Sequence, residues 1–202
     1  WIIVKRKDTA AAWLVWHEHN SWNHVLRFYT NPETDSASGR VGAFDNGSQG
    51  TSSVFTVFQG SSAYDNCNIN GDEYIFWAWT EKQGYSKFGK YTGNGNADGP
   101  FVYTGFQPAF VMIKVLGDTE SWVMFDNKRK SFNQDVAVNS IYANTSGPEY
   151  TGASYHNIDI LSNGFKVLLT NTAINKVNKT YVYMAFAQHP FVTSTGLPVT
   201  AK

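Results

Sequence analysis

The fold is decided by two related stretches of sequence, Tyr74-Ile-Phe-Trp-Ala-Trp79 and Tyr181-Val-Tyr-Met-Ala-Phe186. Successive side chains of a β-strand point to opposite faces of the sheet, and in both stretches both faces are apolar. We therefore expect two strands that are covered on each side. One face would fill a sandwich core and the other would pack on a neighbouring repeat or subunit. The alternative for the second face is a platform on which sugars stack.

Further blocks of similar sequence occur in the same order in the two halves of the chain. Trp1-Ile-Ile-Val-Lys5 aligns with Phe110-Val-Met-Ile-Lys114. Two further pairs of blocks are Trp13-Leu-Val-Trp16 with Trp122-Val-Met-Phe125, and Phe55-Thr-Val-Phe58 with Phe165-Lys-Val-Leu168. This order predicts an internal duplication of an all-β module. Chance likeness between aromatic, β-branched strands is the alternative.

The repeat sets the expected domain boundaries. We expect a first repeat over residues 1–93, a second over 94–192 and a C-terminal tail over 193–202. The second copy carries Gly105-Phe-Gln-Pro-Ala109 ahead of Phe110, and nothing in the sequence precedes Trp1. We therefore expect the first copy to lack its opening strand and the chain to begin inside a larger polypeptide.

Alternating residues bounded by turn dipeptides predict short strands throughout. Asn46-Gly47, Asn70-Gly71, Asn94-Gly95, Asp98-Gly99 and Asn163-Gly164 are typical of hairpin turns. The expected fold is all-β, with two tandem β-sandwich, jelly-roll-like modules. The expected strands lie near residues 1–6, 12–17, 25–30, 40–44, 54–58, 73–80, 87–91, 101–104, 109–115, 121–126, 139–143, 158–161, 164–170 and 180–187.

Composition narrows the classes of partner. Sixteen Lys and Arg balance sixteen Asp and Glu, so no basic surplus is present to neutralise phosphates and we expect no nucleic-acid partner. Cys67 is the single cysteine, which excludes an intrachain disulfide. Apolar runs fall far short of the ~20 residues of a transmembrane helix, so we expect no membrane insertion.

Several motifs together resemble a known family: Gly89-Lys-Tyr-Thr-Gly-Asn-Gly95, Gly105-Phe-Gln-Pro-Ala-Phe-Val-Met-Ile-Lys114, Ser121-Trp-Val-Met-Phe-Asp126 and Leu161-Ser-Asn-Gly-Phe165. They are similar to a domain of unknown function found near the C-termini of tail-fibre and other virion proteins of marine bacteriophages, including cyanophages. The resemblance implies an all-β fold and a virion or extracellular location. It supplies no catalytic residues.

Exposed aromatics are the main candidates for ligand binding. Trp22 and Tyr29 lie in the less repetitive part of the first copy, with Asn23 and His24 as polar companions. Flat rings bind the apolar faces of sugars, and amide or imidazole groups order the hydroxyls. We expect any carbohydrate contact here.

Metal and catalytic signals are weak. His17-Glu-His19 is the densest group of potential ligands, and if the strand continued, His17 and His19 would share one face. We expect solvated histidines at a strand end, with a two-histidine metal site as the alternative. Cys67 lacks any nucleophile signature, so we expect no enzyme and no cofactor.

The leading functional hypothesis is a non-enzymatic structural module of a phage tail fibre or virion that contributes to attachment to bacterial surface polysaccharide. Expected partners are further copies of itself, as in a homotrimer, and other virion proteins. The alternatives are a carbohydrate-binding module of a secreted bacterial protein and a purely structural virion spacer or decoration protein.

Overall fold

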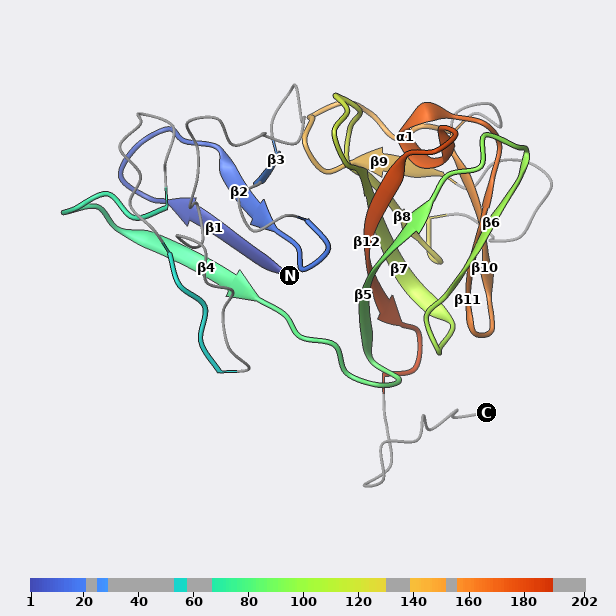
Figure 1. Ribbon diagram of the computed structural model, residues 1–202, viewed down its shortest axis with the longest axis horizontal. Coiled ribbons are helices and arrows are strands. Elements are labelled where there is room, and N and C mark those ends of the chain that lie inside the picture. The colour runs from blue at the N-terminus through green and yellow to red at the C-terminus, as the bar shows by residue number, and fades with distance from the viewer. Residues whose placement is uncertain (21–24, 29–52, 58–66, 130–138, 152–155, 191–202) are drawn as a thin grey trace. The chain divides into compact units, whose positions relative to one another are not determined.

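The computed structural model describes residues 1–20, 25–28, 53–57, 67–129, 139–151 and 156–190 (Figure 1). The described part contains twelve strands and one four-residue helix, which confirms the expected all-β class. The chain divides into two compact units. The first comprises Trp1–Trp79 with Gly117–Thr119, and the second Thr80–Leu116 with Glu120–Lys202.

The first unit is built on a four-stranded antiparallel sheet with the order β3-β2-β1-β4. Its strands are β1 (Ile2–Arg6), β2 (Trp13–Trp16), β3 (Leu26–Phe28) and β4 (Tyr74–Ala78). One face carries a small buried cluster that includes Val4, Leu14 and Cys67. Strand β4 lies at the edge of this sheet and pairs only with β1 among the described strands.

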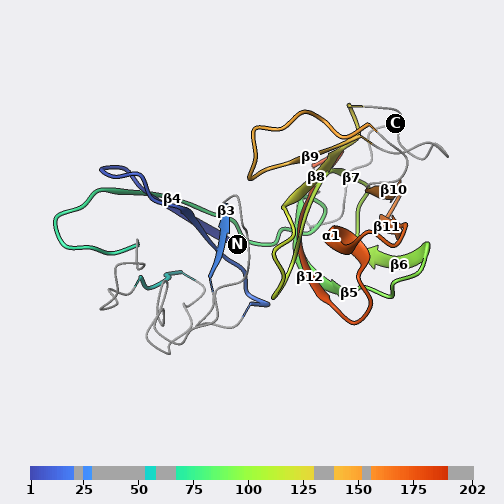
Figure 2. The same ribbon diagram turned by 90° about the horizontal axis from the view of Figure 1, so that it is seen from above.

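The second unit is a sandwich-like pair of sheets. The five-stranded sheet has the order β5-β12-β7-β8-β9 and the three-stranded sheet the order β10-β11-β6. Figure 2 shows the helix α1 (Thr172–Asn175) lying between them. The strands are β5 (Ser86–Thr92), β6 (Asp98–Tyr103), β7 (Pro108–Val115), β8 (Val123–Asp126), β9 (Ser140–Tyr142), β10 (Asn157–Leu161), β11 (Gly164–Leu168) and β12 (Thr180–Ala187).

A continuous apolar core fills the space between these two sheets. Val111 and Ile113 of β7 contribute from one sheet, Phe165 of β11 from the other, and Ile174 from α1. All four side chains are fully buried. Their alternation along each strand explains why the sequence reads as period two, since every second residue faces this core.

The two units share the register of their central strands. Ile3 pairs with Val15 and Trp77 in the first unit, and the residue aligned with Ile3, Met112, pairs with Met124 and Met184 in the second. Met124 and Met184 are the residues that the sequence alignment matches to Val15 and Trp77. Identical registers are what a duplication predicts. The agreement supports the duplication, which stays a hypothesis.

The division between units falls earlier than the expected boundary at residues 93 and 94. Strand β5 would have belonged to the first repeat, yet it pairs along its length with β12. Both β5 and β6 precede β7, so the second unit opens with two strands that have no counterpart in the described part of the first. The sequence pattern predicts only one missing opening strand, because β5 and β6 resemble no segment of the first half.

Two local predictions differ from the structure, and a third falls outside the described residues. Residues 54–57 form no strand ladder with the described residues, although the sequence predicts a strand over 54–58. Asp98-Gly99 opens β6 instead of forming a turn. A Cβ on Gly99 would collide with the Val167 carbonyl oxygen, so this glycine permits close approach of strands. The expected strand 40–44 lies outside the described residues.

Among the described helices, none has the length and apolar character needed to cross a membrane.

Candidate functional site

A pair of partly exposed aromatic side chains lies on the outer face of the sheet of the first unit. Trp13 of β2 and Trp77 of β4 stack at a ring-centroid distance of 5.3 Å and an interplanar angle of 22°. Strand β1 runs between their two strands, so the rings meet above it. Exposed fractions of 39% for Trp13 and 36% for Trp77 leave both rings partly open to solvent.

The surroundings of this aromatic pair combine apolar and polar groups. Ile75, which is 43% exposed, shares the face because it lies two residues from Trp77. Lys5 shares it as well, since Lys5 is the register partner of Ile75. A flat aromatic surface beside a cationic side chain can contact an apolar ring face and an oxygen-rich ligand at the same time.

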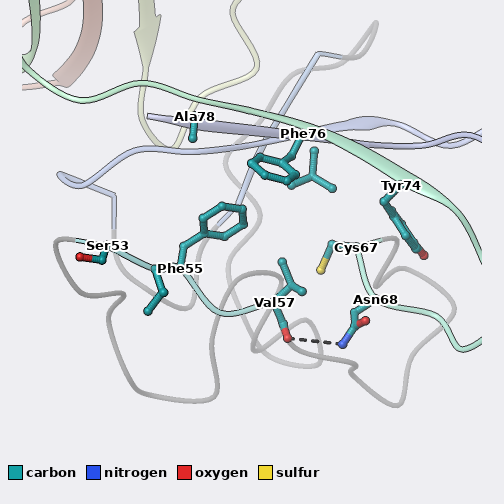
Figure 3. Close-up of a pocket in the computed structure, with 10 residues that line it drawn as sticks. Ser53, Phe55, Val57, Cys67, Asn68, Tyr74, Phe76 and Ala78 are labelled. Atoms are coloured by element: carbon teal, nitrogen blue, oxygen red, sulfur yellow. Dashed lines mark hydrogen bonds between the residues drawn. The ribbon is translucent and has the colours of Figure 1, made fainter.

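A second feature lies on the inner face of the same sheet. A pocket of about 620 Å³ is bounded by Val4, β4 and the segments 53–57 and 67–68. Figure 3 shows the ring of Phe55 beside the ring of Phe76, with the Cys67 thiol nearby. The two ring centroids are 5.1 Å apart in an edge-to-face arrangement.

The lining of this pocket is predominantly apolar. Asn68 uses its Nδ2 to donate to the Val57 carbonyl at 3.4 Å, so part of its polar capacity is already engaged (Figure 3). The Tyr74 phenol is neutral at pH 7, and burial raises its pKa further. Such a pocket suits an apolar or aromatic occupant better than a charged one.

The expectation of solvated histidines at the end of β2 is confirmed for His19, which is exposed, and is wrong for His17. Strand β2 stops at Trp16, and His17 is fully buried with its ring edge against Trp1 at 5.0 Å. Its Nδ1 accepts a hydrogen bond from the backbone N–H of His19 at 3.0 Å. The described residues contain no cluster of three or more His, Cys, Asp or Glu that could hold a metal.

A histidine and a serine meet in the second unit. The Ser140 hydroxyl lies 3.0 Å from Nδ1 of His156, and the Tyr142 hydroxyl lies 3.3 Å from Nε2. Ser140 and His156 are each 1% exposed. Burial lowers the pKa of His156 to about 4. A substrate could not reach this serine, so the arrangement reads as an internal polar network of the core.

The predicted ligand-binding residues Trp22, Asn23, His24 and Tyr29 lie outside the described residues. Sequence reasoning placed Trp77 in an apolar face without identifying its partner Trp13. The two are 64 positions apart in the chain, and only the registers of β1 with β2 and β4 bring them together. The signal available in the sequence is the two-residue spacing of Trp13 and Val15, which places both side chains on one face of their strand.

These features define an all-β, sandwich-like module with an exposed aromatic surface on its first unit. The chain belongs to the family described as "Domain of unknown function (DUF7483)", whose model matches residues 1–190. The expected membership in a domain family of unknown function is therefore confirmed, and the bacteriophage context stays a prediction. No curated protein and no solved structure gave a match to the chain.

Proposed function

We propose that this chain is a non-enzymatic structural and binding module of a phage virion appendage, which attaches to bacterial surface polysaccharide through the Trp13–Trp77 pair. The observation that carries the proposal is this stacked and partly exposed pair on a sheet face. The sequence resemblance supplies the virion context.

The chemistry of the pair suits a sugar. Pyranose rings present flat C–H surfaces that pack against aromatic faces, and Trp offers the largest such face of any side chain. Because the two residues project from adjacent parts of one hydrogen-bonded sheet, little conformational entropy is lost when a ligand binds. Lys5, on the same face, would favour an acidic or hydroxyl-rich glycan.

The absence of an assembled catalytic group in the described part of the chain supports a binding role. Ser140 with His156 is sealed in the core, and Cys67 is 2% exposed. Both potential nucleophiles are thus withdrawn from solvent. The balanced charge of the chain also gives no support to nucleic-acid binding.

A binding site of low affinity on each copy of the chain would suit an appendage that contains several copies. If several copies of the chain assemble, as in the expected homotrimer, modest contacts at each copy combine into strong attachment by avidity. A carbohydrate-binding module of a secreted protein would use the same pair without this multiplicity.

The first test is the binding of fluorescently labelled protein to candidate bacterial cells before and after removal of their surface polysaccharide. We expect binding that disappears with the polysaccharide and that falls by roughly tenfold or more in Trp13→Ala and Trp77→Ala. Tyr103→Ala is the matched control, because Tyr103 is an exposed aromatic (64%) of the second unit.

Two outcomes would contradict the proposal. Unchanged binding in both Trp variants, with loss in Trp22→Ala or Tyr29→Ala, would move the site to the residues expected from sequence. No binding at multivalent concentrations, with strong self-association, would leave a structural spacer. Circular dichroism of each variant separates loss of binding from loss of fold.

A further inference from the structure

The pocket of the first unit matches a filled part of the core of the second. The sequence alignment and the shared registers relate its lining residues to buried residues of the second unit. The matched pairs are Val4 with Ile113, Phe55 with Phe165, Val57 with Val167, Tyr74 with Tyr181, Phe76 with Tyr183, and Ala78 with Ala185. All six counterparts belong to the core cluster of the second unit.

The packing around these residues is also equivalent. Phe55 meets Phe76 edge to face at 5.1 Å, and Phe165 meets Tyr183 edge to face at 5.3 Å. The segment 53–57 therefore occupies the position of β11, although it forms no ladder with the described residues. The first unit therefore has an equivalent of β11, which belongs to the three-stranded sheet of the second unit.

Side chains from β5 and β6 fill the corresponding space in the second unit. Tyr91 of β5 stacks on Tyr181 at 4.9 Å and 9°, and approaches the edge of Phe165 at 6.2 Å. Val102 of β6 pairs with Phe165. The first unit has the counterparts of Tyr181 and Phe165 in its pocket but no described counterpart of Tyr91 or Val102.

The sheet edge beside the pocket is open on the same side. The backbone carbonyl of Glu73 accepts a hydrogen bond from the backbone N–H of Lys7, and the backbone N–H of Trp79 donates to the carbonyl of Trp1. These bonds show that every second residue from 73 to 79 directs its backbone groups toward β1. The backbone groups of Tyr74, Phe76 and Ala78 consequently point away from β1. No described strand pairs with them, whereas their counterparts on β12 pair with β5.

Because no described strand covers the edge of β4, its side chains are more exposed than their counterparts on β12. Phe76 is 57% exposed, while its counterpart Tyr183 is 2% exposed. A long apolar edge strand open to solvent invites pairing with another chain, and natural proteins usually cover such edges. The edge of β4 carries no Lys, Pro or bulge that would block an added strand.

The second unit also shows what residue must face Phe76. Tyr183 pairs with Gly89 of β5, and a Cβ on Gly89 would lie 2.6 Å from the Tyr183 hydroxyl oxygen and 2.8 Å from its ring carbons. The ring of Tyr183 thus lies across the glycine. Tyr91 follows two residues later on the same face. An aromatic-Gly-x-aromatic sequence, as in Phe88-Gly-Lys-Tyr91, satisfies both contacts.

We propose that the open edge of β4 and the adjoining pocket accept a β5- and β6-like pair of strands, with a glycine opposite Phe76 and an aromatic side chain in the pocket. We infer that a segment N-terminal to β1 supplies this pair of strands. This source is favoured because β5 and β6 directly precede β7, the strand whose register β1 shares. The proposal is independent of the sugar contact, which uses the opposite face.

The test grafts residues 84–109 of this chain directly before Trp1, so that the added β5 and β6 sequences precede β1 with their natural spacing. Amide hydrogen exchange is then measured by NMR in the grafted and ungrafted chains. We expect exchange at Phe76 and Ala78 to slow by at least about tenfold in the grafted chain. Unchanged amide signals from β7 and β12 verify that the second unit remains folded.

A matched control carries Gly89→Val in the grafted copy alone. Valine favours strands, so a loss of protection in this variant arises from the collision with Phe76 and not from strand propensity. Equal protection in both grafted chains would overturn the proposed register. No protection in either would overturn the proposal itself.

A concentration series of the ungrafted chain tests a second copy as the occupant. If exchange at Phe76 already slows with concentration as dimers form in sedimentation, the edge is covered by another copy and the proposal fails. Polysaccharide binding is assayed on the same samples, so failure of the strand proposal and failure of the sugar proposal are distinguishable.

Discussion

Individual buried polar residues of the second unit illustrate how its core tolerates groups that prefer water. His156 is held by Ser140 and Tyr142 through its two ring nitrogens, and Tyr91 donates its phenol to the Ile174 carbonyl at 2.7 Å. Each group is satisfied inside the core. Removing one partner would therefore leave another polar atom buried without a bond.

His156 should make the second unit sensitive to acid. Its pKa in the folded state is about 4 and that of an unfolded histidine is about 6.5, because burial disfavours the charged ring. The unfolded state thus binds the proton first. The stabilising contribution is complete above pH 6.5 and is lost progressively as pH falls toward 4, by up to about 3 kcal/mol.

Urea unfolding of the protein at pH 7.5 and pH 4.5 measures this loss. In His156→Gln the difference between the two pH values should shrink, because the amide does not titrate. An equally large acid loss in the variant would assign the effect to other groups, and the carboxylates would be examined next.

Tyr91 offers a second prediction at this scale. Tyr91→Phe keeps the ring stacked on Tyr181 but removes the hydroxyl that bonds Ile174, which leaves a buried carbonyl of α1 unpaired. We expect the free energy of unfolding to fall by about 1–2 kcal/mol. Chemical denaturation measures it, and Tyr103→Phe at an exposed position is the control. A loss no larger than that of the control would show that water replaces the bond.

At the scale of elements, most strands could be predicted from the sequence because alternation and turn residues are local signals. A hairpin does join β10 and β11 where the sequence predicts one, but its turn residues are Ser162 and Asn163, and Gly164 already belongs to β11, where it pairs with Leu161. His17 escaped prediction because β2 ends one residue earlier, so its side chain turns into the interior against Trp1. Gly99 escaped because a glycine needed for close strand approach is indistinguishable in sequence from a turn glycine.

The candidate site was predictable only in part. Alternation along β4 shows that Trp77 is not on the face of Phe76, but its partner depends on which strands are neighbours in the sheet. Strand order is a long-range property, and nothing local to Trp13 or Trp77 encodes it. The equivalence of Phe55 and Phe165 was visible in the alignment, whereas the missing ladder at 54–57 was not.

At the scale of the whole molecule, the two units differ in completeness. Every strand pairing and the main core cluster of the second unit fall within residues 80–202. We therefore expect a fragment of residues 80–202 to fold alone and to unfold cooperatively, with a melting temperature within about 10 °C of that of the same unit in the full chain.

A fragment of residues 1–79 should behave differently. Because no described strand pairs with the outer edge of β4 and no described side chain fills the pocket, we expect a broad, weakly cooperative transition. Thermal melts followed by circular dichroism and tryptophan fluorescence compare the two fragments. A sharp transition in 1–79 and none in 80–202 would reverse this assignment.

The interior position of β12 in its sheet has a mechanical consequence. It is hydrogen-bonded along its length to β5 on one side and to β7 on the other. A pull transmitted along β12 therefore loads two ladders in shear, and many hydrogen bonds must yield together. The same tension along β4 meets only one ladder among the described strands, so within a chain under load we expect the first unit to extend first.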